Sequence, residues 1–194
     1  AVLWLPARIA LSAAGLAVCA LPRALELRLG PPLGRLILAC GLRRKIVAEN
    51  IRRCYPELAP EERERLVARN YEHYGILLLE YLHFFSPLPG HFRRYAARIS
   101  RFEGREHWEK ARAKGKGVLV VSSHMGFWEM NAAAAGLAGV APTVVTTVLK
   151  PQWLHDKITA CRSSCGVSAA YHPGSVPAVL KALRRGGSVA FMND

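Results

Sequence analysis

The stretch Gly117-Val118-Leu119-Val120-Val121, followed by Ser122-Ser123-His124-Met125-Gly126-Phe127-Trp128-Glu129, decides how this chain of 194 residues is interpreted. A short, continuous run of aliphatic residues is typical of a strand buried on both faces of a parallel sheet. Residues 127–137, after the polar loop, predict a helix. Strand, loop and helix in this order put His124 just beyond the carboxyl end of a strand, where ligand sites form in such sheets.

Strands and helices alternate through the rest of the chain. Strands are predicted over residues 143–149, 167–171 and 188–192, and helices over residues 151–164 and 177–185. Upstream, residues 95–102 are interpreted as a strand, and a helix is predicted from there to about Lys114. We therefore expect an α/β fold with a largely parallel sheet and flanking helices, preceded by N-terminal helices.

Two helices are predicted before this α/β part. Residues 34–54 form the first, which Tyr55-Pro56 ends, and Pro60 begins the second at a first-turn position. The second helix carries apolar or aromatic residues every three or four positions, which we interpret as packing against the core: Val67, Tyr71, Tyr74, Leu78, Tyr81 and Phe85. Glu80 is an isolated charge in this stretch, so it either faces solvent or is a buried carboxylate bonded to an arginine.

The first 22 residues are nearly all apolar, although Arg8 leaves only Ile9–Leu21 uncharged, which is shorter than the roughly 20 residues that span a bilayer. We expect residues 1–30 to form a membrane-anchoring or interfacial helix, with a buried core helix as the alternative. The basic cluster Arg43-Arg44-Lys45 indicates the cytoplasmic side and attracts anionic headgroups. Residues 31–194 would form the α/β domain, which we expect to be truncated at its C-terminus because the sequence stops directly after a strand.

The net charge of +13 is spread along the chain and suits an anionic partner, such as nucleic acid, an anionic membrane, a phosphorylated substrate or an acidic carrier protein. No helix-turn-helix, zinc-finger or RNA-recognition signature is present, so we do not expect nucleic acid as a partner. The five cysteines are odd in number and irregularly spaced. They predict buried free thiols in a reducing compartment, without a zinc site.

The loop after the first strand contains the residues best suited to catalysis. His124 can accept a proton from a hydroxyl, and Glu129 can hold the other ring nitrogen. Within one straight helix the two would lie roughly 140° apart, so they meet only if His124 is in the loop and Glu129 is in the first helical turn. Backbone N–H groups near Gly126 could stabilise an oxyanion. The alternative is a histidine that caps the helix and an exposed glutamate that favours the helix dipole.

Residues 122–129 resemble the His-x4-Asp/Glu motif of membrane acyltransferases. They resemble more closely the form in the bacterial lipid A biosynthesis (lauroyl/myristoyl-type) acyltransferase family, where Gly, Trp and Glu follow the His. Further segments resemble that family in order along nearly the whole chain: Glu49-Asn50-Ile51 with Tyr55-Pro56-Glu57, Glu80, Phe102-Glu103-Gly104, Arg162 with Gly166, and residues 183–187 with Asn193-Asp194. Ser123 is a departure, because related glycerolipid acyltransferases usually have Asn there.

The resemblance implies a glycerolipid-acyltransferase-like fold and O-acyl transfer from an acyl thioester, on acyl carrier protein or coenzyme A, to a hydroxyl of an anionic lipid A precursor. His124 would be the general base and Glu129 its partner. The residues implied to bind substrate are Arg162, Asp194, Gly126 and Trp128, with Arg162 either meeting a phosphate or forming a surface salt bridge. No metal and no cofactor besides the thioester co-substrate are implied. The implied location is the cytoplasmic face of the bacterial inner membrane.

Two other functions remain open from the sequence. The acceptor could be a different glycolipid or phospholipid, such as a phosphatidylinositol mannoside or lysophosphatidate, although Trp128 and Glu129 disfavour the lysophosphatidate type. The protein could also be a non-enzymatic membrane protein that binds anionic lipid. In that case the cluster Arg43-Arg44-Lys45 would matter for function, and His124 would not.

Overall fold

The computed structural model describes residues 4–193. By their contacts these residues form two compact units, which meet in the sequence between Pro87 and Leu88. We call residues 4–87 the helical unit and residues 88–193 the α/β unit. Each is described by itself.

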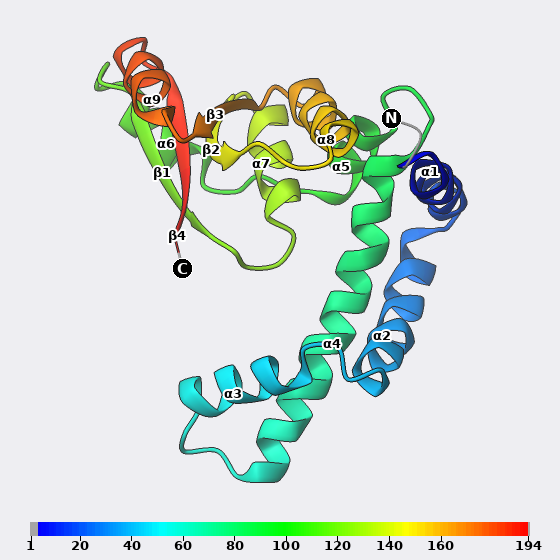
Figure 1. The fold of residues 1–194 in the computed structure, drawn as a ribbon. Coiled ribbons are helices and arrows are strands. Elements are labelled where there is room, and N and C mark those ends of the chain that lie inside the picture. Colours follow the sequence, from blue (N-terminus) through cyan, green and yellow to red (C-terminus); the bar gives the residue numbers. More distant parts are fainter. Residues whose placement is uncertain (1–3, 194) are drawn as a thin grey trace. The chain divides into compact units, whose positions relative to one another are not determined.

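The helical unit contains α1 (Leu5–Cys19), α2 (Arg23–Ala39), α3 (Arg44–Cys54), α4 (Pro60–Leu82) and the single 3₁₀ turn η2 (His83–Phe85). Helix α2 lies along α4, and α3 packs against the first half of α4 (Figure 1). The predicted continuous helix over residues 34–54 is wrong. The chain leaves the helix at Cys40 and turns through Gly41 and Arg43, whose φ angles of 68° and 57° are left-handed and incompatible with a continuing helix.

Glycines let α2 and α4 approach until their backbones touch. A Cβ atom added to Gly34 would lie 2.0 Å from the carbonyl oxygen of Tyr71, and one added to Gly75 would lie 2.0 Å from that of Gly30. A small residue every fourth position is a common device for such close crossings, and here it is Gly30-x3-Gly34. Any side chain at these positions would force the two helices apart.

A buried ionic cluster also joins α2 to the end of α4. Arg23 donates from Nη1 to Oε2 of Glu26 at 2.9 Å and from Nη2 to Oε1 of Glu80, while Nε2 of His83 lies 3.1 Å from Oε1 of Glu26. Glu26 is fully buried and Glu80 is 6% exposed. Glu80 is therefore the arginine-bonded buried carboxylate that was one of the two sequence-based alternatives.

Helix α1 has 15 residues. Within residues 4–193 no helix combines the length and apolar character needed to cross a bilayer. Membrane attachment through residues 1–30 stays a prediction.

The α/β unit consists of α5 (His91–Ile99), α6 (Arg105–Arg112), β1 (Val118–Ser123), α7 (Trp128–Leu137), β2 (Thr143–Thr147), α8 (Gln152–Ser164), β3 (Ser168–His172), α9 (Ser175–Arg184) and β4 (Ser188–Asn193). The four strands lie in the order β1-β4-β2-β3, and all three pairings are parallel. The predicted α/β fold with a parallel sheet is confirmed.

Helices cover both faces of this sheet. Val145, Ala170 and Val189 point to one face, where they pack against Val179 and neighbouring residues of α9. Side chains alternate along a strand, so Tyr171 and Ser188 point to the other face. There Tyr171 contacts Thr159 of α8, and Ser188 accepts a hydrogen bond from the Trp108 indole of α6 at 2.9 Å.

Two predictions for this unit are wrong. Residues 95–102 are not a strand: Phe92, Tyr95 and Ala96 are buried at helical spacing in α5. The second concerns β1, which was predicted to be buried on both faces. It lies at the edge of the described sheet, and Leu119 and Val121 are 60% and 74% exposed. An aliphatic run is common to all strands of a parallel sheet, so it carries no information on which strand is at the edge.

All five cysteines are free thiols, as predicted. Burial is confirmed for Cys161 and Cys165 in the α/β unit, whereas Cys40 and Cys54 in the helical unit are exposed. Burial raises the pKa of the Cys161 thiol to about 11, against the smaller opposing effect of Lys157. Burial likewise raises the pKa of Cys165.

Candidate active site

His124 lies in the four-residue loop between β1 and α7, and its side chain is exposed. The loop can turn here because Gly126 has a left-handed φ of 63°, which few other residues adopt without strain. The imidazole meets the ring of Trp128 edge to face, with ring centroids 5.4 Å apart and planes at 82°. The loop therefore presents a histidine at the carboxyl end of a parallel strand.

Glu129 lies in the first turn of α7 and is only 8% exposed. Both of its carboxylate oxygens accept hydrogen bonds from Arg162: Nε to Oε2 at 2.8 Å, and Nη2 to Oε1 at 2.5 Å. The Arg162 side chain is 13% exposed and lies in the last turn of α8. Each charge thus sits at the helix end whose dipole favours it, and the two-bond geometry fixes the carboxylate in position.

The hydrogen bonds that the Glu129 carboxylate accepts from other described residues come from Arg162 and not from His124. Of the predicted site residues, the structure thus brings Glu129 and Arg162 together, and places His124 of the adjoining loop against Trp128, the first residue of α7. A carboxylate has about four lone-pair positions, so the bonds to Arg162 leave acceptor capacity for a further donor. Asp194, the last predicted site residue, lies outside the described residues.

A hollow of about 580 Å³ opens beside the His124 loop, at the carboxyl ends of β1 and β4. Its walls combine hydroxyl and amide groups with apolar side chains: Val121, Ser122, Ser123, Met125, Asn131 and Asn193. Ser123 and Asn193 come together because they are opposite each other in the parallel pairing. Asn131 was missed from the sequence, although an amide in an alanine-rich helix was an available signal.

The buried thiol nearest to this ion pair in the sequence is Cys161, directly before Arg162 in α8. Its pKa, raised to about 11 mainly by burial and partly by the negative charge of Glu129, keeps it protonated at neutral pH. A protonated buried thiol is a poor nucleophile, so Cys161 is not a candidate nucleophile of this region.

Two acyltransferases of Escherichia coli are similar in sequence to this chain. The chain is 35% identical over 122 residues to the "Lipid A biosynthesis lauroyltransferase" of Escherichia coli, an alignment that covers 62% of this chain and 38% of that protein. It is 28% identical over 99 residues to the "Lipid A biosynthesis palmitoleoyltransferase" of the same organism, over 49% of this chain and 30% of that protein. The aligned parts thus span well under half the length of these relatives.

The sequence profile of the bacterial lipid A biosynthesis acyltransferases matches residues 4–194, which is nearly the whole chain. The resemblance found in the motifs around His124, Arg162 and Asn193 is thereby confirmed. The chain belongs to the bacterial lipid A biosynthesis acyltransferase family.

Proposed function

We propose that this protein transfers a fatty acyl group from an acyl thioester to a hydroxyl of a lipid A precursor, with His124 as the general base. The observation that supports this most directly is the exposed His124 at the carboxyl end of β1, five residues before the buried Glu129 that pairs with Arg162. Family membership supports the same reaction class.

In the proposed reaction the acceptor hydroxyl oxygen attacks the thioester carbonyl carbon while His124 takes its proton. Backbone N–H groups near Gly126 and the start of α7 stabilise the oxyanion of the tetrahedral intermediate. When the intermediate collapses, the carbon–sulfur bond breaks. The thiolate leaves with the proton that the imidazolium returns, so the products are an ester and a free thiol. No protein nucleophile and no metal takes part in this scheme.

Glu129 acts in this proposal as the partner of His124. Arg162 holds the Glu129 carboxylate in place. The remaining acceptor positions of that carboxylate receive the imidazole N–H when His124 turns toward α7. A negative charge fixed there stabilises the imidazolium that forms during the attack. Arg162 then acts first as a positioning residue. A direct contact of its guanidinium with a substrate phosphate remains part of the proposal.

In this proposal the acyl donor is attached to an acidic molecule and the acceptor lipid is itself anionic. Both suit a chain of net charge +13. The donor would be acyl carrier protein or coenzyme A bearing the acyl group, and the acceptor a phosphorylated glycolipid. Trp128, Gly126 and Asp194 would line the substrate site. The reaction would take place at the cytoplasmic face of the bacterial inner membrane.

Mass spectrometry of a lipid A precursor tests this function. Membranes containing the protein receive an acyl-carrier thioester and a tetra-acylated precursor, and the mass gain of one acyl group is followed over time. His124→Ala should slow the gain by about 10²- to 10⁴-fold, the usual range for a general base. His107→Ala is the matched control, because His107 is an exposed histidine whose side chain is 86% accessible on α6.

Equal rates in the His124→Ala and His107→Ala membranes would reject His124 as the base. Consumption of the thioester that depends on His124, without acylation of the precursor, would keep the reaction class and reject the lipid A precursor as the acceptor.

A further inference from the structure

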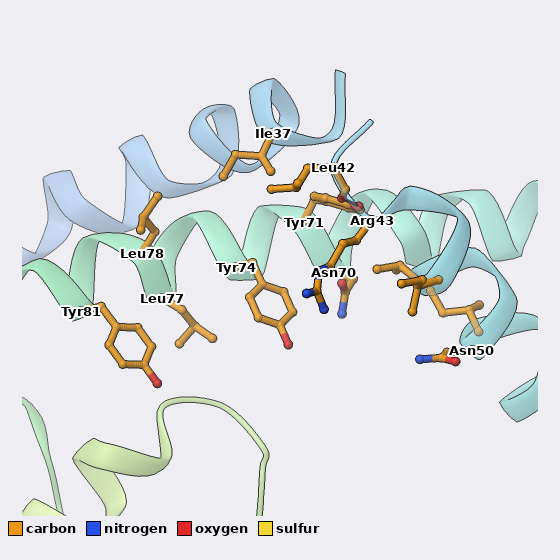
Figure 2. Close-up of a pocket in the computed structure, with 13 residues that line it drawn as sticks. Ile37, Leu42, Arg43, Asn50, Asn70, Tyr71, Tyr74, Leu77, Leu78 and Tyr81 are labelled. Carbon is orange, nitrogen blue, oxygen red and sulfur yellow. Dashed lines mark hydrogen bonds between the residues drawn. The ribbon is translucent and has the colours of Figure 1, made fainter. Parts of the chain in front are cut away.

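A second hollow, of about 650 Å³, lies in the helical unit among α3, α4 and the turn that joins α2 to α3 (Figure 2). We call it the α3–α4 groove. Its walls are mostly aliphatic and aromatic, with Arg43, Asn50 and Asn70 as the polar side chains among residues such as Ile37, Leu42, Ile46, Tyr74, Leu78 and Tyr81. A volume of this size is typical of sites that enclose a small apolar ligand.

The apolar side chains of this groove are unusually accessible. Leu42, Ile46, Tyr74 and Leu78 are 63%, 56%, 53% and 43% exposed. The sequence analysis predicted that the regularly spaced apolar and aromatic residues of α4 pack against a core. This is confirmed for Val67 and Tyr71, but wrong for Tyr74 and Leu78. Large apolar groups gathered around one hollow indicate a surface that binds another molecule.

One cation stands at the rim of the groove. Arg43 has a left-handed φ of 57°, a conformation that residues other than glycine rarely adopt. The neighbouring carbonyl of Leu42 accepts a hydrogen bond from the Tyr71 hydroxyl, which attaches this turn to α4. Figure 2 shows the Arg43 side chain reaching from the turn to the side of Asn70.

Arg43 differs from the arginines around it in its lack of a counter-ion. Arg44 pairs with Glu64, and Arg52 and Arg53 both pair with Glu49. Within residues 4–193 the Arg43 side chain makes no ion pair or hydrogen bond, even though it lines the groove. An unpaired guanidinium beside an apolar hollow is suited to a ligand that has a phosphate and a hydrocarbon chain.

We propose that the α3–α4 groove binds one acyl chain of an anionic bilayer phospholipid, with the lipid phosphate at Arg43. The charge of α3 supports a lipid surface over a protein partner: Ile46 and Ile51 line the groove, while Lys45, Arg52 and Arg53 are exposed on the helix. This combination is typical of helices that lie in the interface of an anionic membrane. The proposal concerns binding alone and does not rest on the proposed acyl transfer.

Photo-crosslinking with vesicles tests the groove. Vesicles contain phosphatidylglycerol that carries a diazirine in one acyl chain, and labelled peptides of the protein are mapped by mass spectrometry. Label should appear in residues 42–51 and 70–81. A matched phosphatidylcholine probe should label these residues several-fold less, because it lacks net negative charge.

Two variants test separately the contact with the lipid phosphate and the contact with the acyl chain. Arg43→Gly removes the cation while glycine keeps the left-handed turn, and it should lower groove labelling about fivefold. Leu78→Asn should lower it several-fold by making the wall polar. The controls Arg101→Gly and Leu36→Asn remove an exposed cation and an exposed apolar side chain outside the groove, and labelling should stay unchanged.

Three results would overturn the proposal. They are labelling confined to segments outside the groove, equal labelling by the phosphatidylcholine probe, and groove labelling that neither Arg43→Gly nor Leu78→Asn reduces. Circular dichroism of each variant shows whether the helical unit has stayed folded, and urea midpoints show whether its stability has changed.

Discussion

Each of the two units buries a glutamate against an arginine, but the surroundings of the two pairs differ. In the helical unit Arg23 holds Glu26 and Glu80 between α2 and the end of α4. In the α/β unit Arg162 holds Glu129 in the first turn of α7, directly after the exposed loop of His124. The first pair joins two helices of the helical unit, while the second lies in the first turn of the helix that follows the exposed His124 loop.

The two pairs show how an isolated charge in an apolar stretch should be interpreted. Glu80 and Glu129 both interrupt runs of apolar residues, and both turn out to be buried against arginine. Only Glu129 follows the carboxyl end of a parallel strand, the place where sites form in such sheets. Position in the topology, more than burial or charge, therefore separates a candidate catalytic carboxylate from a structural one.

Replacing each arginine with methionine should have the largest effect on stability. Arg23→Met leaves Glu26 and Glu80 without their guanidinium, and Arg162→Met does the same to Glu129. We expect each change to lower the free energy of unfolding by about 3 kcal/mol, since an uncompensated buried carboxylate is costly. Urea titration followed by circular dichroism measures the loss.

The two variants should differ in acyl transfer per folded molecule. Arg162→Met should lose most of it, while Arg23→Met should keep it. Retained transfer in Arg162→Met would mean that the two arginines have the same, purely structural role.

Alanine at the glycines of close helix contacts should have the next largest effect. Gly75→Ala adds a Cβ that would lie 2.0 Å from the Gly30 carbonyl oxygen, and Gly136→Ala adds one 2.2 Å from that of Cys165. Each should cost about 1–3 kcal/mol of unfolding free energy, because backbone atoms cannot move aside cheaply. Gly41→Ala is the control, since it meets no atom within 4 Å and carries only the strain of its positive φ. A larger loss in Gly41→Ala than in Gly75→Ala would contradict the close helix contact.

The cysteines of the two units should differ in their reactivity toward a thiol reagent. The expected effect on stability is smaller than that of the glycine substitutions. With a thiol reagent at pH 8, Cys40 and Cys54 should react at once, whereas Cys161 and Cys165 should react only after unfolding.

The raised pKa of Cys161, about 11, means that its protonated form stabilises the fold fully below the pKa of about 9 in the unfolded chain. This contribution is lost as the pH rises from about 9 to 11. Labelling of Cys161 in the native protein at the rate of Cys40 would contradict its burial.

The smallest effect is expected at Glu49 of the helical unit. Hydrogen bonds from Arg52 and then Arg53 lower the pKa of this carboxyl from 4.5 to about 2. Any stabilisation from this group is therefore present above pH 4.5 and lost as the pH falls toward 2. Because the group is solvent-exposed, Glu49→Gln should leave the Tm at pH 7 unchanged in a thermal melt. A Tm loss at pH 7 as large as that of Arg23→Met would contradict the contrast between exposed and buried pairs.

The sequence was sufficient for most of the α/β unit, since short strand-like and helix-like segments alternate there and turns separate them. It failed for residues 95–102, which were interpreted as a strand although burial in residues 92–96 follows the helical period of α5. It also missed the break at Cys40–Arg43. The break contains Gly41, a helix-ending signal that was available in the sequence, and a left-handed Arg43, which no propensity predicts.

The sequence predicted which residues belong to the candidate site better than it predicted which of them bond to each other. His124 and Glu129 follow from a strand tip and a first helical turn, both local features. The bond between Glu129 and Arg162 joins residues 33 positions apart, and it depends on how α7 and α8 pack. Nothing in the local sequence of either residue specifies the other. The open groove beside Tyr74 could not be predicted either, because its stripe has the spacing of a buried helix face.

The most direct test of the contrast between the two pairs is the acyl-transfer rate of Glu129→Gln beside Glu80→Gln, each measured as mass gain of the lipid A precursor per folded molecule. Both changes remove one buried negative charge and keep the side-chain shape. We predict that Glu129→Gln loses at least about 10²-fold in rate, while Glu80→Gln loses stability and stays within a few-fold of the wild-type rate. A Glu129→Gln protein with the wild-type rate would contradict the assignment of this carboxylate to catalysis.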